Sequence, residues 1–298
     1  MEDYADLGLL SLTVALSLLL ARFKRKTDGR SESELLQHYR IERELADRLR
    51  RAPRHERRTL YTSLYDELFR RVSSHPQRDI SPEKLAVEVE RQYGFLQRFL
   101  RRRHAYMELG AGDCAMALKV AAEVERVCVV EVSEEITRRV QPPKNFSLIL
   151  SDGCSIDVPA DSIDLAYSNQ LMEHLHPEDA EEQLRNIYRS LRPGGRYVCI
   201  TPNRHYGPRD ISEYFDEVAT GFHLKEYSAA ELRALMKATG FSHVSFYAGA
   251  RGWYVPCPYW LIAMLETALE KLPRRRRKLI ADFAPLRAVL GLRVCARK

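Results

Sequence analysis

The sequence has six cysteines among its 298 residues, but no two of them show the C-x-x-C spacing of zinc sites and redox centres. Four of the six lie in or beside apolar runs that are expected to form buried strands or turns. A small secreted domain held together by disulfides is therefore excluded, and a reducing compartment is favoured. The pair His174-x-His176 suggests a metal, but no ligand cluster accompanies it, so no metal site is predicted.

The apolar run at residues 7–21 is short for a membrane span. As a helix it would measure about 22 Å, whereas the hydrocarbon core of a bilayer is ~30 Å thick. The residues before it are acidic, whereas a signal peptide begins with a basic region. A marginal anchor, a helix packed on the domain and an upstream-misplaced start codon all remain open. If the segment does span, the basic flank at residues 22–26 would keep the rest of the chain in the cytoplasm.

The excess of basic over acidic residues is confined to the C-terminal part of the chain. The net charge is +6, but residues 271–298 hold ten lysines and arginines and one acid, a balance of +9, so the rest of the chain carries −3. The run from Arg274 to Lys278 dominates this excess. It is interpreted either as a solvated tail or as a surface attracted to polyanions or to an anionic membrane. The protein is expected in the cytoplasm, with attachment to the cytoplasmic face of the membrane as an open hypothesis.

Residues 105–132, AYMELGAGDCAMALKVAAEVERVCVVEV, read as strand, glycine turn, helix and second strand. Gly110 and Gly112 allow a tight turn and the close approach of a ligand to the backbone. Glu131 ends the second strand 21 positions after Gly110, close to the offset of roughly 20 residues at which Rossmann-type units place an acid on ribose hydroxyls. The unit therefore predicts a cofactor that carries a ribose.

The identity of that cofactor depends on the charge of the turn. Residues 110–115 also fit the G-x-G-x-x-G/A dinucleotide pattern, which leaves a nicotinamide cofactor open. Glu108 and Asp113 would repel a pyrophosphate, whereas S-adenosylmethionine carries a sulfonium and an ammonium and no phosphate. A helix N-terminus at the turn could still receive the carboxylate of that cofactor. The alternative interpretation is that both acids merely cap and solvate the loop.

Strands and helices continue to alternate along the chain. Apolar runs predict a third strand at 146–150, a fourth at 163–167, a fifth at 197–200 after a Pro-Gly-Gly turn, and a sixth at 242–247. The last residues, 289–298, predict an antiparallel seventh strand. An insertion at about 250–287 contains both tryptophans and an apolar helix, and its expected role is to cover part of the domain.

These residues resemble the class I S-adenosylmethionine-dependent methyltransferases, in the methyltransferase type 11-like branch. The fourth strand of that branch runs into an N-x-x-x-E-H segment, here residues 169–174, and the fifth follows a PGG turn, here residues 193–195. The resemblance covers about residues 104–249 and resumes at the C-terminus. It implies an α/β, Rossmann-like, seven-stranded and mostly parallel sheet with an antiparallel last strand, and methyl transfer as the activity.

The resemblance also implies which residues hold S-adenosylmethionine. Glu108, Gly110 and Gly112 would face the methionine part, Glu131 the ribose, Asp152 the adenine, and Asn169 the region below the sulfonium. The full implied set is Glu108, Gly110, Ala111, Gly112, Glu131, Val132, Asp152, Gly153 and Asn169. Cys114 stands where many members have a third glycine, and a slightly wider turn is expected there.

Three parts of the chain are predicted: an apolar segment with a basic flank at 1–26, a helical extension or lid at 27–103, and the methyltransferase domain at 104–298. In the family resembled, N-terminal helices and the segment after the fifth strand wall the acceptor pocket. Apolar residues at helical spacing in the extension agree with this role or with packing alone.

Methyl transfer is expected to be a direct displacement in which the protein mainly aligns the reactants. A base is needed only for a protonated acceptor; the candidates are His174, His176 and His205, with Asp210 and His223 as further ones. His223 is favoured instead as a residue that pins its loop.

The absence of motifs typical of nucleic acid methylation narrows the class of methyl acceptor. No N/D-P-P-Y/F segment follows the fourth strand, and Cys257 lies after the sixth strand, so a nucleic acid acceptor is disfavoured. A small molecule, a lipid or a glycan-linked precursor is expected. The alternatives are a nicotinamide-dependent oxidoreductase and a non-catalytic cofactor-binding module.

Overall fold

The computed structural model describes residues 29–76, 81–138, 140–250 and 252–298. The expectations for residues 7–21 and for the basic flank at 22–26 lie outside the described residues. Within the described ranges, no helix combines the length and the apolarity needed to cross a bilayer.

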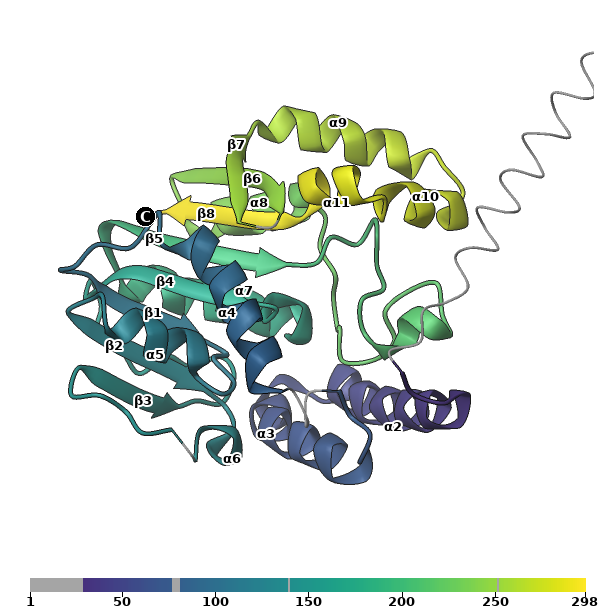
Figure 1. Ribbon diagram of the computed structural model, residues 1–298, viewed down its shortest axis with the longest axis horizontal. Helices are drawn as coiled ribbons and strands as arrows, with labels where there is room; N and C mark the ends of the chain where they lie inside the picture. Colours follow the sequence, from purple (N-terminus) through teal and green to yellow (C-terminus); the bar gives the residue numbers. More distant parts are fainter. Residues whose placement is uncertain (1–28, 77–80, 139, 251) are drawn as a thin grey trace, which may run out of the picture.

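A single eight-stranded sheet forms the centre of the molecule (Figure 1). The strands lie in the order β3-β2-β1-β4-β5-β8-β6-β7. Strands β1 to β5 are mutually parallel, and β8 is antiparallel to both of its neighbours, β5 and β6. Their bounds are β1 Ala105–Leu109, β2 Arg126–Glu131, β3 Phe146–Leu150, β4 Ile163–Asn169, β5 Leu191–Thr201, β6 His243–Ala250, β7 Trp253–Cys257 and β8 Leu292–Arg297.

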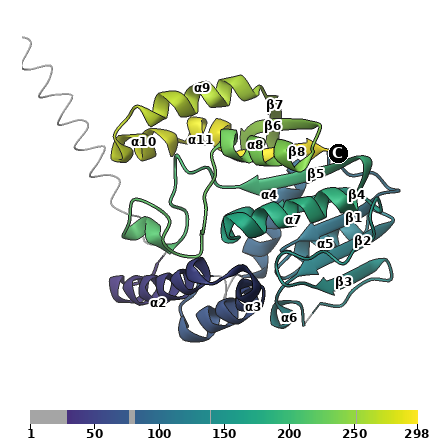
Figure 2. The same ribbon diagram turned by 180° about the vertical axis from the view of Figure 1, so that it is seen from behind.

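Helices cover both faces and the carboxyl edge of the sheet. They are α2 Glu32–Arg51, α3 Arg54–Arg71, α4 Pro82–Leu96, α5 Ala115–Ala121, α6 Glu134–Thr137, α7 Pro177–Ser190, α8 Ala229–Thr239, α9 Tyr259–Glu270, α10 Arg274–Ala281 and α11 Ala284–Leu290, with short 3-10 turns η1 Met172–His174 and η2 Ile211–Tyr214. Helices α4 and α5 lie on the face seen in Figure 1, and α7 and α8 lie on the face seen in Figure 2.

The strand residues alternate between these two faces, as the two-residue period of a strand requires. In β1, Tyr106 packs with the α4 and α5 side, whereas Met107 and Leu109 pack with the α7 and α8 side. Every residue of β1 is buried. The continuous apolar run that predicted a strand covered on both faces is therefore explained by the two helical layers.

The expected seven-stranded, mostly parallel sheet with an antiparallel C-terminal strand is confirmed, and the structure adds an eighth strand. This strand, β7, lies within the insertion at 250–287 and forms an antiparallel hairpin with β6. The sequence analysis did not predict it, because a strand at the edge of a sheet leaves alternate residues exposed and lacks a long buried run. Trp253 and Val255 of β7 are exposed.

The helical extension joins the sheet at two places. Helices α2 and α3 pack together below the carboxyl ends of the strands, whereas α4 crosses one face of the sheet (Figure 1). A buried ion pair attaches α3 to α7: Arg57 donates to both carboxylate oxygens of Asp179, over 2.6 and 2.8 Å. The hydroxyl of Tyr61 donates to the same carboxylate over 2.7 Å. These contacts fix α3 over the edge of the sheet at which the glycine turn lies.

Candidate functional site

The glycine turn follows β1 at the carboxyl edge of the sheet. Gly110 and Gly112 have φ angles of +64° and +55°, which side chains rarely adopt. The Gly110 amide donates to the Val130 carbonyl over 2.9 Å and so ties the turn to β2. A Cβ at Gly110 would lie 2.9 Å from Cδ1 of Leu171, whereas a Cβ at Gly112 would meet nothing within 4 Å. Gly112 therefore presents the open side of the turn, where a ligand can approach the backbone.

Cys114, the departure from the family pattern, keeps a glycine-like backbone. Its φ angle is +61°, in the left-handed region, and its side chain is fully buried. All six cysteines are buried, and none is disulfide-bonded.

Two acidic residues approach the turn from the strand ends. Burial raises the pKa of Glu108 to about 8, and the nearby carboxylates of Asp113 and Glu131 add to this effect. Glu108 accepts a hydrogen bond of 2.8 Å from the Tyr106 hydroxyl. Glu131 accepts from the amides of Gly112 and Val132, over 2.9 and 2.8 Å. The carboxylate that was expected on a ribose thus lies directly against the glycine turn.

Helix α3 covers the residues expected on the adenine side. Asp152 accepts from Arg58 of α3 over 2.9 Å and from the amides of Cys154 and Ser155. Burial would raise the pKa of Asp152, but these amides and the arginine lower it below its ordinary value. A Cβ at Gly153 would lie 2.9 Å from the Tyr61 ring. Thr62 donates to the Val132 carbonyl over 2.9 Å, so α3 closes against both strand ends.

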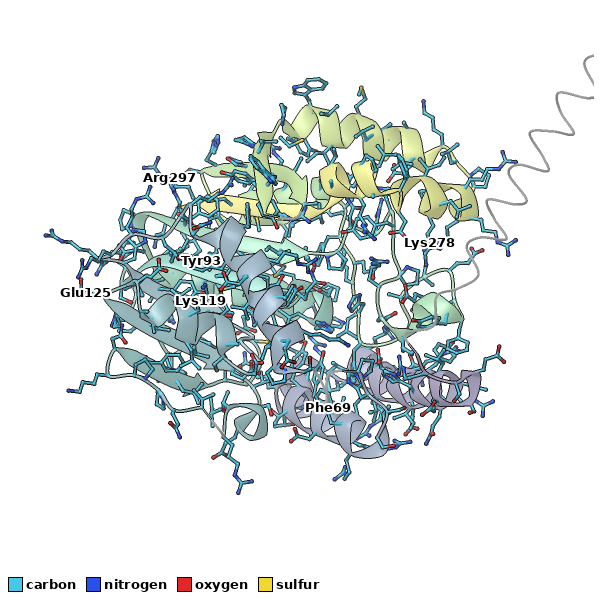
Figure 3. All side chains as sticks on the ribbon, in the orientation of Figure 1. Phe69, Tyr93, Lys119, Glu125, Lys278 and Arg297 are labelled. Atoms are coloured by element: carbon cyan, nitrogen blue, oxygen red, sulfur yellow. The ribbon has the colours of Figure 1, made fainter. Side chains whose placement is uncertain are left out.

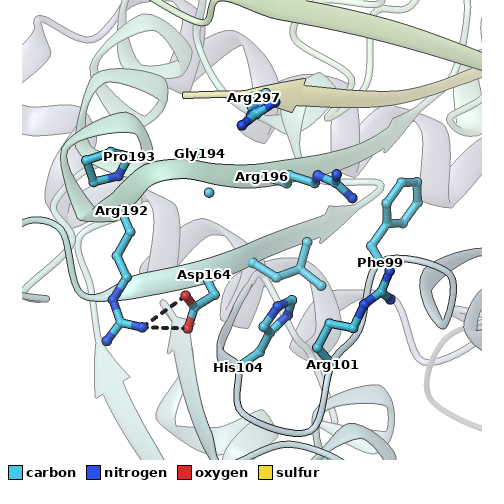
Figure 4. Close-up of a pocket in the computed structure, with 11 residues that line it drawn as sticks. Phe99, Arg101, His104, Asp164, Arg192, Pro193, Gly194, Arg196 and Arg297 are labelled. Atoms are coloured by element: carbon cyan, nitrogen blue, oxygen red, sulfur yellow. Dashed lines mark hydrogen bonds and ion pairs between the residues drawn. The ribbon is translucent and has the colours of Figure 1, made fainter.

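A pocket of about 420 Å³ lies at the opposite edge of the sheet (Figure 4). His104 precedes β1, Asp164 lies near the start of β4, and Arg192 lies near the start of β5. The carboxylate of Asp164 is paired with Arg192, whose guanidinium lies 2.9 Å from each carboxylate oxygen. Because ligands of open α/β sheets bind at the carboxyl ends of the strands, this pocket is not the cofactor site.

A buried polar cluster lies just after β4. Glu173 is fully buried; its Oε2 accepts from the Thr201 hydroxyl over 2.8 Å, and its Oε1 has no partner among the described residues. The rings of His174 and His223 meet edge to face, with centroids 4.9 Å apart. His174 Nδ1 lies 3.2 Å from the Phe222 carbonyl, and His223 Nδ1 lies 2.7 Å from Glu226 Oε1.

The cluster shifts the pKa values of all three residues. Burial lowers the pKa of His174 to about 3 and raises the pKa of Glu173 to about 7. Burial would also lower the pKa of His223, but the hydrogen bond to Glu226 and the charge of Glu173 raise it to about 9. The chain thus places a neutral imidazole, a charged imidazole and a buried carboxyl group together, at the end of the strand that holds Asn169.

The candidate bases occupy different environments. His174 lies in the cluster described above, and Asp210 touches it, since the His223 amide donates to Asp210 over 3.2 Å. His176 precedes α7 and acts as its helix cap: its ring nitrogen accepts weakly from the Glu178 amide, and its own amide donates to the Tyr61 hydroxyl oxygen over 3.0 Å. His205 is buried with its Nε2 3.8 Å from Glu270 of α9. The structure therefore brings His174 together with His223, and not with His176 or His205.

His223 does pin its loop, as expected, and it also faces His174. The residues that the sequence analysis missed are Glu173 and Glu226, the carboxyl groups that surround these rings. Glu173 lies within the segment that predicted the family, but its role depends on His223, which is 50 positions later in the chain.

Comparison with known proteins shows which family the chain matches. Residues 36–245, more than half of the chain, match a family model described as "Methyltransferase domain". A probable S-adenosylmethionine-dependent methyltransferase of Mycolicibacterium smegmatis is 29% identical over 136 residues, which are 45% of this chain and 51% of that protein. A carboxy-S-adenosyl-L-methionine synthase of Shewanella sp. strain MR-7 is 29% identical over 139 residues, 43% of this chain and 56% of that protein. The chain spans about half the length of the curated relatives it matches.

Solved structures show the same fold. Phosphoethanolamine N-methyltransferase 1 of Haemonchus contortus, in complex with phosphoethanolamine and S-adenosylhomocysteine, is similar with a TM-score of 0.55 and 15% identity, covering 74% of this chain and 57% of that one. The family match supports S-adenosylmethionine as the cofactor and not the dinucleotide that the glycine pattern left open. The chain therefore belongs to the methyltransferase-domain family of S-adenosylmethionine-dependent enzymes.

Proposed function

We propose that this protein transfers the methyl group of S-adenosylmethionine to a small-molecule acceptor by direct displacement. The observation that carries the proposal is the position of the acidic glycine turn beside the buried cluster after β4, at one edge of the sheet. The acceptor atom attacks the methyl carbon as the carbon–sulfur bond breaks, and the sulfur keeps the electron pair. The contribution of the protein is alignment of the two reactants.

On the cofactor side, the open face of Gly112 receives the methionine part, and Glu131 binds the ribose. Charge favours this assignment, because Glu108, Asp113 and Glu131 attract a sulfonium and an ammonium. A carboxylate has about four lone-pair sites, so Glu131 can accept from the ribose hydroxyls while it keeps its hydrogen bond with the Gly112 amide. Asp152 on the adenine side and Asn169 below the sulfonium remain part of the proposal.

On the acceptor side, α2, α3 and the segment after β5 form the wall. Glu42 of α2 accepts from the Phe222 amide over 2.8 Å, and Arg50 of α2 donates to the Gly221 carbonyl over 2.6 Å. Tyr65 of α3 stacks on Phe222 with ring centroids 4.6 Å apart. A site enclosed in this way suits a small acceptor, and the Haemonchus contortus enzyme holds phosphoethanolamine in the same fold. Of His174, His176 and His205, we retain His174 as a residue of the acceptor site.

Calorimetry with S-adenosylmethionine, S-adenosylhomocysteine and NAD tests the cofactor, and labelled methyl transfer to fractions of small molecules, lipids and nucleic acids tests the acceptor. We expect binding of the first two compounds and label in a low-molecular-weight product. Binding of NAD alone would contradict the proposal. A modified cofactor without a methylated acceptor would favour an activity like that of the synthase relative.

We also propose a peripheral contact with the cytoplasmic face of an anionic membrane, made by β7, α9 and α10. Trp253 and Trp260 are 85% and 65% exposed, which is unusual for residues of this size. The basic helix α10 packs against α9. Lys278 projects from α10 toward the segment after β5 (Figure 3), so the exposed positive charge comes from Arg274, Arg275 and Arg276. Tryptophans beside arginines are typical of surfaces that bind anionic lipids.

Sedimentation with anionic and neutral liposomes at two salt concentrations tests this contact. We expect binding to anionic vesicles that weakens with salt, and loss of binding when Trp253 and Trp260 are replaced by Ser or when Arg274–Arg277 are replaced by Ser. A protein that stays in the supernatant with every vesicle would refute the contact, and the insertion would then be a cover for a soluble acceptor.

A further inference from the structure

Three side chains of the buried cluster are arranged as ligands. One nitrogen from His174, one nitrogen from His223 and one carboxylate oxygen of Glu173 all lie within 4.8 Å of one another. Glu173 is completely shielded from solvent, and its Oε1 has no hydrogen-bond partner within the described ranges. A buried carboxylate oxygen without a partner is costly, so the position calls for a positively charged or donating group.

The hydrogen bonds made by the Nδ1 atoms of His174 and His223 orient both imidazoles to bind a metal ion. A backbone carbonyl and a carboxylate can only accept, so the Nδ1 atoms that face Phe222 O and Glu226 Oε1 each carry a proton. The Nε2 atom of His174 then offers a lone pair. The pKa of His223 is raised to about 9, so its Nε2 offers a lone pair once an incoming cation displaces the proton there. Metal-bound histidines are held in this way, with the distal ring nitrogen on a carbonyl or carboxylate.

Other groupings of ligand-type residues in the described parts of the chain are already satisfied. In the grouping of His38, Glu42 and His75, His38 donates to Glu42 over 2.8 Å, and Glu42 also accepts from the Phe222 amide. The two groupings that contain Asp179 are neutralised by Arg57, which occupies both of its oxygens. By contrast, no arginine or lysine of the described residues pairs with Glu173, His174 or His223.

We infer that Glu173, His174 and His223 bind a divalent first-row cation, with Zn²⁺ or Mn²⁺ as the first candidates. Two imidazoles and one carboxylate are a donor set for such ions, and three protein ligands leave a coordination position open. The cation accounts for the unpartnered oxygen of Glu173.

The position of the cation site indicates which class of acceptor the proposed function uses. This part of the inference rests on the proposed function. Glu173 follows Asn169 by four residues at the end of β4, and the inference places the open position on the side of the expected sulfonium. A cation there would bind an oxygen of the acceptor and lower the pKa of a bound hydroxyl. The acceptor class is therefore a small molecule that presents a hydroxyl group, which loses its proton to solvent and then accepts the methyl group on oxygen.

The test uses full-length protein treated with a chelator and dialysed, and then titrated with Zn²⁺, Mn²⁺ and Mg²⁺ by calorimetry, with the bound metal counted by mass spectrometry. We expect one Zn²⁺ or Mn²⁺ per chain, at least about 100-fold weaker binding in Glu173→Gln and His223→Asn, and about 10- to 100-fold weaker binding in Glu226→Gln, which removes only an outer hydrogen bond. His38→Gln and His205→Gln, matched changes of buried histidines outside the cluster, should bind as the wild type does.

Either of two results would overturn the inference: no stoichiometric binding by the wild type, or unchanged binding in both Glu173→Gln and His223→Asn. If one of these variants does not fold, the other and the Co²⁺ absorption spectrum of the wild-type protein, which reports nitrogen and oxygen ligands, decide the question. S-adenosylmethionine binding by the chelated protein is measured in parallel. Cofactor binding and methyl transfer without metal would refute the role of the cation in the reaction and leave the proposed function intact.

Discussion

Substitutions of single glycines in the turn distinguish effects on the free energy of unfolding from effects on cofactor affinity. Gly112→Ala forces an alanine to a φ of +55° but meets no atom, so it should cost about 1 kcal/mol of unfolding free energy. Its methyl group would occupy the open face of the turn, so cofactor affinity should fall much more than stability. Gly110→Ala adds a contact with Leu171 and should cost about 2–3 kcal/mol. Urea unfolding and calorimetry measure the two effects; equal losses of affinity and stability in Gly112→Ala would contradict the assignment of its open face.

Substitution of Glu131 tests the assignment of the ribose site. Glu131→Ala removes a charge-assisted hydrogen bond to the cofactor, so binding of S-adenosylmethionine should weaken by ~1.5–3 kcal/mol. Calorimetry measures the change, and circular dichroism confirms that the turn still folds without its bond to the Gly112 amide. Asp152→Ala provides a comparison on the adenine side, where cofactor affinity should fall more than turnover at saturating cofactor.

The pKa of Glu108 predicts a pH dependence. Because burial raises this pKa to about 8, the folded state holds a proton that the unfolded chain releases near its ordinary pKa of 4.5. Stability should therefore fall as pH rises from about 5 to 8. Glu108→Gln should flatten this slope, and denaturant titrations across that range compare the two proteins. A steeper fall in the variant would show that another group controls the slope.

The same residue links pH to the cofactor. A bound sulfonium and ammonium favour the charged form of Glu108, so binding should release protons between pH 6 and 8 in the wild type. Calorimetry in buffers of different ionisation enthalpy measures that release. Glu108→Gln should release fewer protons, and an equal release from both proteins would assign the protons elsewhere.

At the scale of secondary-structure elements, a buried ion pair between Arg57 and Asp179 attaches α3 to α7. Asp179→Asn leaves the guanidinium of Arg57 with the exposed Glu178 as its remaining charged partner. Loss of one partner from a buried pair typically costs 3–5 kcal/mol, so we expect a loss of about 3 kcal/mol. The double variant Arg57→Met, Asp179→Leu removes both charges and should be less destabilised than the single one. Urea unfolding compares them; a double variant at least as unstable as Asp179→Asn would mean that the pair itself is strongly net stabilising.

The strand β7 and the helix α4 show why the sequence did not predict the complete sheet or the packing of the N-terminal helices. The strand β7 forms because the edge of β6 offers unpaired backbone groups, which is a property of the assembled sheet. Helix α4 belongs to the same N-terminal extension as α2 and α3, yet it packs on the face of the sheet. Periodicity predicted that these helices form, but their partners are set by surfaces from distant parts of the chain.

For the whole molecule, the C-terminal strand is the most sensitive part of the fold. Strand β8 lies between β5 and β6 and pairs with both. Deletion of residues 292–298 should therefore abolish cooperative unfolding, because β6 and β7 would lose their connection to the sheet. Replacement of Arg274–Arg277 by Ser is the control and should keep a wild-type transition in circular dichroism. A deletion variant that unfolds cooperatively would show that the parallel half of the sheet is stable alone.

The sequence by itself determined the features that lie within short stretches of chain. The glycine turn and the acid at the end of β2 lie within one stretch of about thirty residues, and the strand alternation is visible in short apolar runs. The family was predicted from the same stretch together with the short segments 169–174 and 193–195. Local backbone preferences and two-sided burial leave clear patterns in such stretches. Tertiary structure alone decided that His223 meets Glu173 and His174, that Arg58 pairs with Asp152 and that α3 closes the cofactor edge. These contacts join residues 49 to 94 positions apart, and the packing of helices on the sheet brings such residues together in ways that a linear pattern does not record.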